Sequence, residues 1–387
     1  MGAHKKKRFR IIIILLLFII YFFLAARPIP REVILSPNWI SSLTENTVAE
    51  TFEGASLPVI AGGTPTGVTP TSFILGSRFG YVDSKGQFIV NRIMANNIYR
   101  GRNIWTEYED EPSRIDIKNL SEETIISIEN AGGYPVLLDD RVFILGSEQN
   151  ALSEIDENGD LLWIYEFGAP LTCIDVAAGL VLTGSLDGII EIFNSSGERI
   201  FYFEPGGSRY EVILGCALSR DGSRIGIISG IDQQRFLLLE RFGSTGGDYK
   251  VIFHEFLNTG FRRPVRILFI DEDRRIVFER TGGIGCYNIR TRQGIFIPLD
   301  GEIYTIEESG DQGFLFLITS HGIIDKKLVG IRFPQDRLFN FNPGFTNANA
   351  IFLKAHFKSE DVFLGRDGSK LIVGGGSTLI SYNLEEK

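Results

Sequence analysis

Val142-Phe143-Ile144-Leu145-Gly146-Ser147 opens a stretch, residues 142–167, that the chain repeats almost at once as residues 180–205. Each copy reads as an apolar run, a Gly-Ser break, a second apolar run, an Asx-x-x-Gly turn and a closing run with an aromatic residue. Short apolar runs separated by turn residues predict strands, so each copy supplies three strands. A shift of 38 residues pairs Gly146-Ser147 with Gly184-Ser185, Leu152 with Ile190, Ile155 with Phe193, Asp156 with Asn194, Gly159 with Gly197 and Trp163 with Phe201.

Further copies of this unit fill most of the chain. The run Phe73–Ser77 repeats Phe143–Ser147 letter for letter, and a turn at Asp83–Gly86 follows it. A strand-rich repeat of about 40 residues is typical of one blade of a β-propeller. A divergent unit fits at 104–128, and weaker copies lie at 225–240, 276–298, 314–333 and 371–384.

These units predict an all-β fold, a seven- or eight-bladed β-propeller over residues 72–387. Eight candidate units are present, and seven blades remain open if two partial units complete one blade. The 387 residues are 44% hydrophobic, which is enough for a large core. The 30 Phe and 43 Gly fit pleated surfaces joined by many turns. Tight hairpins are indicated by Asp-Gly pairs at Asp187-Gly188, Asp221-Gly222 and Asp367-Gly368.

The unit from Ala151 to Trp163 resembles the repeat of the quinoprotein-like propellers. Its Asp156, Gly159 and Trp163 match the turn and the final tryptophan of that repeat. The outer-membrane assembly propeller of Gram-negative bacteria is a non-enzymatic relative of that family. WD40-like propellers are the neighbouring alternative, but their Gly-His and Trp-Asp pairs are absent. The resemblance implies the fold rather than an activity. The sequence departs from it in that Phe201 stands where the next repeat of the family has tryptophan.

The N-terminus has the pattern of a membrane anchor. Residues 1–10 hold five Lys/Arg and no acidic residue, and an uninterrupted apolar run extends from Ile11 to Ala26. We expect a basic cytoplasmic tail at 1–10 and an uncleaved transmembrane signal-anchor at 11–27, with the propeller outside the cytoplasm. A cleaved signal peptide is the alternative. The prediction is a single-pass protein of the inner (cytoplasmic) membrane with a periplasmic propeller.

Residues 28–71 are rich in Ser, Thr, Pro and Gly, and they lack a sustained apolar period. This composition predicts a flexible tether with one possible strand at Leu57–Ile60. A propeller must join its last blade to its first, because open sheet edges invite aggregation. We therefore expect a strand from residues 57–75 to pair in the same sheet as the C-terminal strands.

Charge and cysteine content exclude two classes of protein. After residue 10 the chain carries 34 basic and 48 acidic residues, and such an acidic body repels nucleic acid. Cys173, Cys216 and Cys286 are too few for a disulfide framework and form no C-x-x-C pair. Buried core thiols are expected, and a Cys173–Cys216 bridge is left open.

The sequence predicts no catalytic, cofactor-binding or metal-ligating residues. His254, His321 and His356 lie in different units without ligand spacing, so they are expected to be exposed or at strand edges unless the blades bring them together at the channel. The run Asp156–Asp160 is expected to form a β-turn rather than a calcium loop. The glycines at 282–285 and 374–376 are expected in turns or bulges. A solvated rim of mixed charge is expected from Arg262, Arg263, Arg266, Asp271, Glu272, Asp273, Arg274 and Arg275.

Two functions are compatible with these features. The first is a membrane-tethered, extracytoplasmic propeller that acts as a protein–protein interaction scaffold in the bacterial cell envelope. Its partners would be envelope proteins, and the N-terminal helix would hold it to the membrane. The alternative is a quinone- or small-ligand-binding enzyme or sensor with its site in the central channel.

Overall fold

The computed structural model describes residues 13–18, 21, 33–44, 70–243, 248–258, 260–308, 313–333 and 350–386. Two compact units are distinguished, Ser36–Asn383 and a smaller one formed by Met1–Leu35 with Leu384–Lys387. The larger unit contains the sheets described below, with strands at its two ends continuing into the smaller one.

Within these described residues the strands form eight antiparallel sheets, seven of four strands and one of three. Each sheet is one blade, and the strands of a blade follow one another in the chain except in the last, which takes its fourth strand from the N-terminal region. The first blade contains β2 (Thr71–Leu75), β3 (Arg78–Val82) and β4 (Phe88–Ile93); the second contains β5 (Asn97–Arg100), β6 (Trp105–Tyr108), β7 (Arg114–Lys118) and β8 (Thr124–Glu129); and the third contains β9 (Gly133–Leu138), β10 (Arg141–Gly146), β11 (Ala151–Ile155) and β12 (Leu161–Glu166).

The fourth blade contains β13 (Leu171–Ala177), β14 (Leu180–Ser185), β15 (Ile190–Phe193) and β16 (Arg199–Phe203); the fifth contains β17 (Ile213–Leu218), β18 (Arg224–Ser229), β19 (Arg235–Arg241) and β20 (Tyr249–Phe256); and the sixth contains β21 (Ile267–Ile270), β22 (Arg275–Arg280), β23 (Gly283–Asn288) and β24 (Gln293–Pro298). The seventh blade contains β25 (Glu302–Glu308), β26 (Phe314–Ser320), β27 (Asp325–Arg332) and β28 (Ile351–Lys358), and the eighth contains β29 (Val362–Asp367), β30 (Lys370–Gly375), β31 (Thr378–Glu386) and β1 (Val33–Ser42).

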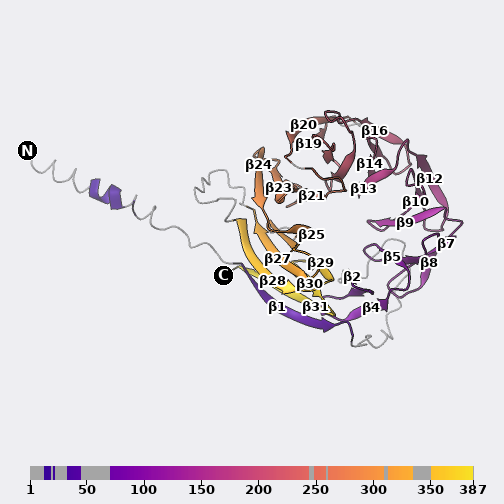
Figure 1. The fold of residues 1–387 in the computed structure, drawn as a ribbon, viewed down its shortest axis with the longest axis horizontal. Helices are drawn as coiled ribbons and strands as arrows, with labels where there is room; N and C mark the ends of the chain where they lie inside the picture. The colour runs from indigo at the N-terminus through magenta and orange to yellow at the C-terminus, as the bar shows by residue number, and fades with distance from the viewer. Residues whose placement is uncertain are drawn as a thin grey trace, which may run out of the picture. The chain divides into compact units, whose positions relative to one another are not determined.

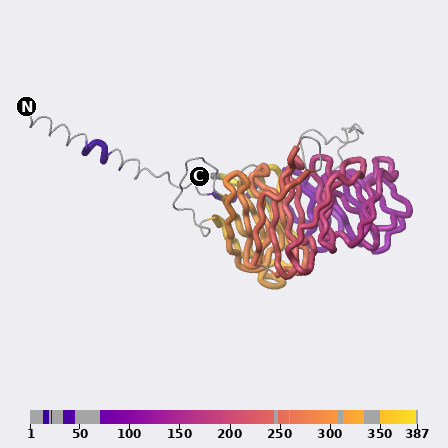
Figure 2. The backbone as a smooth tube through the Cα atoms, turned by 90° about the horizontal axis from the view of Figure 1, so that it is seen from above, coloured from indigo at the N-terminus to yellow at the C-terminus, as the bar shows by residue number. Residues whose placement is uncertain are grey.

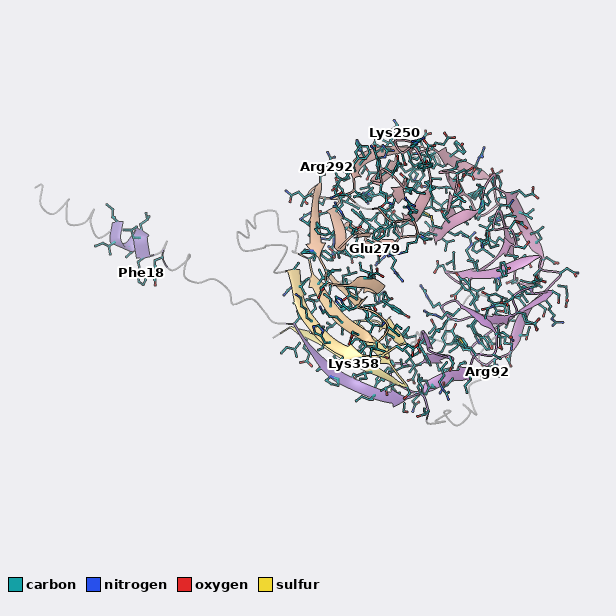
Figure 3. All side chains as sticks on the ribbon, in the orientation of Figure 1. Phe18, Arg92, Lys250, Glu279, Arg292 and Lys358 are labelled. Carbon is teal, nitrogen blue, oxygen red and sulfur yellow. The ribbon has the colours of Figure 1, made fainter. Side chains whose placement is uncertain are left out.

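The eight sheets stand around a common axis (Figure 1), and the strands run between the two faces of the ring (Figure 2). The first strand of each complete blade lies nearest the axis and the fourth lies at the outside. Lys250 on the outermost strand β20 lies at the periphery, whereas Glu279 on β22 lies closer to the axis (Figure 3). The prediction of seven or eight blades is therefore resolved in favour of eight.

The 38-residue repeat corresponds to equivalent positions of the third and fourth blades. Trp163 of β12 pairs with Glu154 of β11, and Phe201 of β16 pairs with Ile192 of β15 at the same shift. A bulge follows at the same place in both blades, between Glu154 and Ile155 and between Ile192 and Phe193. Trp163 is 8% exposed, and Phe201 is half-buried. The predicted register is confirmed, although Phe201 is less buried than expected.

The core consists of apolar layers between neighbouring blades. Period-two alternation along each strand sends side chains to both faces of a sheet, and in a propeller both faces meet another blade. The middle strands are consequently apolar on both faces, as in β14, which is buried along Leu180–Ser185, and in β26, which is buried along most of Phe314–Ser320. Such runs were recognisable in the sequence because they lack the polar alternation of a sheet with one wet face.

Shared strands close the ring, as predicted, but the closing strand is not the predicted one. β1 (Val33–Ser42) pairs with the C-terminal strand β31, whereas β2 (Thr71–Leu75) belongs to the first blade. The possible strand Leu57–Ile60 lies outside the described residues. The prediction of a tether over 28–71 is thus wrong for residues 33–42. Pro37 argued against a strand in the sequence, because proline lacks a backbone N–H. It is tolerated here because β1 is an outermost strand, which has one unpaired edge.

The predicted anchor lies largely outside the described residues. Residues 13–18 and Tyr21 are helical. Among the residues that the structure describes, no helix is long and apolar enough to cross a membrane. The anchor at 11–27 therefore stays a prediction.

Candidate functional site

A cavity of about 420 Å³ lies where innermost strands of four blades end near the axis. It is lined by strands β2, β5, β25 and β29 and by the residues that follow them. Three guanidinium groups and two carboxylates supply its charge, those of Arg100, Arg102, Arg366, Glu307 and Asp367. This mixture can hold a small polar molecule that carries negative charge.

Arg100 is the most constrained cation of this cavity. Its Nη1 donates to the carbonyl of Ser72 at 2.9 Å and to the hydroxyl of Ser72 at 2.5 Å. Its guanidinium lies 6.0 Å from the ring centre of Phe363. Burial lowers the pKa of Arg100, and the nearby Tyr81 and Glu307 oppose that shift. Across the same cavity, burial raises the pKa of the Asp367 carboxyl.

A second cavity, of about 350 Å³, lies between β13, β17 and β21. Asp175 of β13 spans the boundary between the fourth and fifth blades, because its Oδ2 accepts a hydrogen bond of 2.7 Å from the backbone N–H of Leu218. Its Oδ1 accepts from the N–H of Val176 at 2.9 Å. Burial raises the pKa of Asp175 to about 6 in spite of these two bonds. A carboxyl with this pKa changes charge near neutral pH.

The three cysteines are thiols on strands, as expected. Cys216 and Cys286 are buried, on β17 and β23, and Cys173 is half-buried on β13. Cys216 lines the second cavity. Cys173 packs against the apolar cluster between the fourth and fifth blades that contains Cys216.

The histidines do not meet at the axis. His254 and His356 are exposed on the outermost strands β20 and β28. His321 follows β26, where its Nε2 lies 3.3 Å from Oδ2 of Asp300. The expectation of exposed or strand-edge histidines is confirmed for all three, since His321 is exposed as well. In the part of the chain that the structure describes, no three His, Cys, Asp or Glu side chains gather as a metal site.

The predicted turns form as expected. The N–H of Gly159 donates to the carbonyl of Asp156 at 3.2 Å. Oδ1 of Asp156 accepts from the N–H groups of Asn158 and Asp160, each at 2.8 Å. The carboxylate is therefore occupied by its own turn, and the calcium-loop alternative has no support. Gly282 and Gly376 have positive φ in the hairpins β22–β23 and β30–β31. The expectation of turn or bulge glycines is wrong for Gly283, Gly285, Gly374 and Gly375, which lie in regular pairing on β23 and β30.

The expected solvated rim of mixed charge is wrong for Asp271 and Arg275, whereas Arg262, Arg263, Arg266, Glu272 and Arg274 are exposed as expected. Strand β21 (Ile267–Ile270) separates Arg262, Arg263 and Arg266 from the acidic turn that begins at Asp271, so the charges form two groups. Asp271 and Arg275 are buried and form an ion pair, with 4% and 3% exposure. The sequence could not show that this ion pair is buried, because its burial depends on the sheets that pack beside the short hairpin turn.

Arg263 is exposed but pairs with a buried carboxylate. Its guanidinium holds the carboxylate of Glu279, with 3.1 Å between Nη1 and Oε2. Glu279 is only 3% exposed. Hydrogen bonding to Glu279 raises the pKa of Arg263. The pair fastens the loop before β21 to β22, which is a structural role.

An unusual surface lies on the outside of the third blade. Leu161, Leu162 and Ile164 on β12 are 58%, 55% and 55% exposed. β12 is the outermost strand of its sheet and pairs only with β11. Trp163 between them is buried, so its packing holds the strand that carries the exposed side chains in place.

The segment around this apolar strand has no lysine or arginine of its own, although Nη1 of Arg199 donates to the hydroxyl of Tyr165 on β12 at 2.9 Å and Arg141 pairs with Glu154. Between Arg141 and Arg199 the chain has ten acidic residues and no lysine or arginine. We call residues 142–198, which form most of the third and fourth blades, the acidic sector. Of its carboxylates, Glu157, Asp160 and Glu166 are exposed next to or within β12.

The sequence contains both signals of this surface. Leu161-Leu162-Trp163-Ile164 is a run of four large apolar residues on a strand that closes a blade. Because one face of an outermost strand is partly exposed to solvent, some of these side chains have to be exposed. The gap in Lys and Arg can be counted directly. Neither signal identifies a surface until the strand is known to be the outermost one.

Eight sheets around one axis define the class of protein: an eight-bladed β-propeller. A family model described as "beta-propeller protein" matches residues 1–386, and the chain belongs to that family.

Known proteins resemble this chain in sequence and in fold. An uncharacterized protein of Treponema pallidum (strain Nichols) is 27% identical over 303 residues, which are 78% of each chain. The computationally designed Ika8 protein has a TM-score of 0.56 at 11% identity and covers 82% of this chain and 96% of its own. BamB from Moraxella catarrhalis has a TM-score of 0.50 at 10% identity, with coverage of 90% and 100%. BamB is the outer-membrane assembly propeller, so the resemblance stated from the sequence is confirmed for the fold.

Proposed function

We propose that this protein is a membrane-tethered interaction scaffold that binds a protein partner through the outside of its third blade. The observation that carries the proposal is the exposed apolar strand β12 within the acidic sector. Single exposed apolar residues are ordinary on protein surfaces. Three on one strand, around a buried tryptophan, are typical of a binding surface.

The chemistry of this surface selects one kind of partner. Unpaired N–H and C=O groups on the outer edge of β12 can pair with an added strand, and Leu162 and Ile164 provide apolar contacts. Carboxylates around them favour Lys or Arg in the partner and repel acidic segments. The partner is therefore a protein with an extended apolar segment flanked by basic residues.

Site-specific photo-crosslinking in the cells that produce the protein tests this proposal. A photoreactive phenylalanine analogue replaces Leu162 in one variant. In the control variant it replaces Ala355, which is exposed on the outermost strand β28 outside the acidic sector. A discrete protein adduct is expected from position 162 and none from position 355.

A second variant decides whether the adduct reports this surface. Ile164→Lys adds a positive charge beside position 162 and leaves the buried Trp163 in place, so the adduct should fall at least about tenfold. The melting temperature should stay unchanged, because Ile164 is 55% exposed. Equal adducts at both positions, or none at 162, would refute the surface.

The location of the scaffold is part of the same proposal. The basic tail 1–10 and the predicted anchor 11–27 would hold the chain in the cytoplasmic membrane, with the propeller on the outer side. Residues up to β1 would then supply the attachment. A partner would accordingly be an envelope protein.

A second function is favoured by the cavity at Arg100. A ligand-binding sensor or enzyme would hold a small anionic molecule, a quinone among them, where Arg100, Arg102 and Arg366 meet near the axis. Adding quinone and Ca²⁺ to the purified protein tests this function through the melting curve and the visible spectrum. A raised melting temperature or a bound chromophore supports the ligand function, and an unchanged curve leaves the scaffold.

A further inference from the structure

Cys173 and Cys216 lie opposite each other at the boundary between the fourth and fifth blades. Each is on an innermost strand, β13 or β17. The hydrogen bond from the N–H of Leu218 to Oδ2 of Asp175 fixes the register of these two strands. Each cysteine lies two residues before one of these partners, so the same register sets Cys173 beside Cys216.

The side chains of the two cysteines point into the same space. Residues two apart on a strand share a face, so Cys173 projects to the side from which Asp175 reaches β17. Cys216 belongs to the apolar cluster between these blades, and Cys173 packs against that cluster. A Cβ at Gly184 would lie 2.6 Å from Sγ of Cys173 and 2.5 Å from Cγ2 of Ile213. Glycine at 184 therefore permits the fifth blade to pack closely against Cys173.

We propose that Cys173 and Cys216 are a redox pair that forms a disulfide bond between the fourth and fifth blades. The reaction is a thiol–disulfide exchange with a small disulfide oxidant. One thiolate attacks the oxidant, which releases one thiol; the second thiolate then attacks the mixed disulfide, and a second thiol leaves. Two electrons and two protons pass from the pair to the oxidant, whose two halves leave as thiols.

The surroundings of the pair allow this reaction and slow it. Cys216 lines the cavity of about 350 Å³ between β13, β17 and β21, which gives a small oxidant access. Burial raises the pKa of the Cys216 thiol, and the neighbouring Cys173 adds to the shift. Asp175 and Asp273, with carboxylates, and Arg220, with a guanidinium, also line that cavity. Cys173 is half-buried whereas Cys216 is buried, so Cys173 attacks the oxidant first, and Cys216 beside the cavity then attacks the mixed disulfide.

Peptide mapping of the full-length protein tests the proposal. The reduced chain is incubated folded with glutathione disulfide, quenched with acid, alkylated and digested without reductant. The expected result is a linked peptide pair containing Cys173 and Cys216, with Cys286 still alkylated. The melting temperature should rise by about 5 °C relative to the reduced protein, because the bond closes a long loop.

Variants separate this pair from unspecific oxidation. Cys286→Ser should keep both the linked peptides and the rise in melting temperature, since Cys286 lies on β23 of the sixth blade. Cys173→Ser should abolish both. Three alkylated cysteines after oxidation of the unmodified chain, or glutathione adducts alone, would overturn the proposal, and this result needs no variant to fold.

Discussion

The indole of Trp163 lies against Gly197 in the turn of the following blade. A Cβ added to Gly197 would lie 2.4 Å from Cγ of Trp163. The same indole stacks on Phe193 at 5.9 Å, and its Nε1 donates to Oε2 of Glu154 at 2.7 Å. One side chain of the third blade thus fixes the position of the fourth.

The same contact recurs where the ring closes. A Cβ added to Gly86 in the first blade would lie 2.7 Å from Cδ2 of Trp39 on β1. Nε1 of Trp39 donates to the carbonyl of Ser84 at 3.2 Å. The chain therefore has two docking tryptophans, where the repeat pattern alone had shown one. Trp39 was missed because it lies on a strand separated in sequence from its blade.

Removing the indole should loosen the boundary between the third and fourth blades. Trp163→Ala is expected to lower the free energy of unfolding by about 3–5 kcal/mol, as for other large aromatic residues in cores. Trp163→Phe should cost less, because a smaller ring still covers Gly197. Urea unfolding of the three proteins measures both changes. A loss below about 1 kcal/mol for Trp163→Ala would contradict the docking role.

The glycine side of this contact has a matched control. Gly197 and Gly179 both have positive φ, 75° and 76°. Alanine pays the backbone strain at both positions, about 1–2 kcal/mol. Only at Gly197 does the new Cβ also meet an indole, since nothing lies within 4 Å of a Cβ at Gly179. Gly197→Ala should therefore destabilise more than Gly179→Ala in urea unfolding. Equal losses would mean that Trp163 moves aside freely.

Closure of the ring should depend on β1. A chain that begins at residue 43 lacks the outermost strand of the eighth blade and leaves β31 with an open edge. Such edges pair with other chains, so this truncation should aggregate. A chain that begins at residue 28 keeps β1 and should elute as the intact propeller does in size-exclusion chromatography. Identical elution and melting of both truncations would refute closure by β1.

Asp175 should make stability depend on pH. Its pKa is about 6 in the folded protein against 3.8 for an unperturbed aspartate, so the folded state binds the proton more tightly. The contribution of Asp175 to stability is therefore full below about pH 4 and falls as the pH rises through 6. Asp175→Asn should lack this loss. Urea unfolding at pH 4, 5, 6 and 7 should show the wild type losing stability relative to the variant, and a constant difference would contradict the shift.

The predicted anchor at residues 11–27, which contains the apolar run Ile11–Ala26, should remain uncleaved. We expect the intact protein to remain with membranes through alkaline carbonate washing, because a helix of this composition partitions into the bilayer. Its N-terminus should be intact by mass spectrometry. Mature chains that begin at Arg27 would instead identify a cleaved signal peptide.

Local patterns in the sequence determined the blades. Hairpins such as β10–β11 and turns such as Asp156–Gly159 join neighbours in the chain, so their strands and the equivalence of Trp163 with Phe201 follow from spacing alone. Only the tertiary structure decided which distant residues meet. Trp39 with Gly86, Cys173 with Cys216, and the arginines at the axis lie on different blades, and no local spacing links them. The exposed face of β12 also depends on its place as the outermost strand, because the same apolar run in the middle of a blade would be buried on both sides.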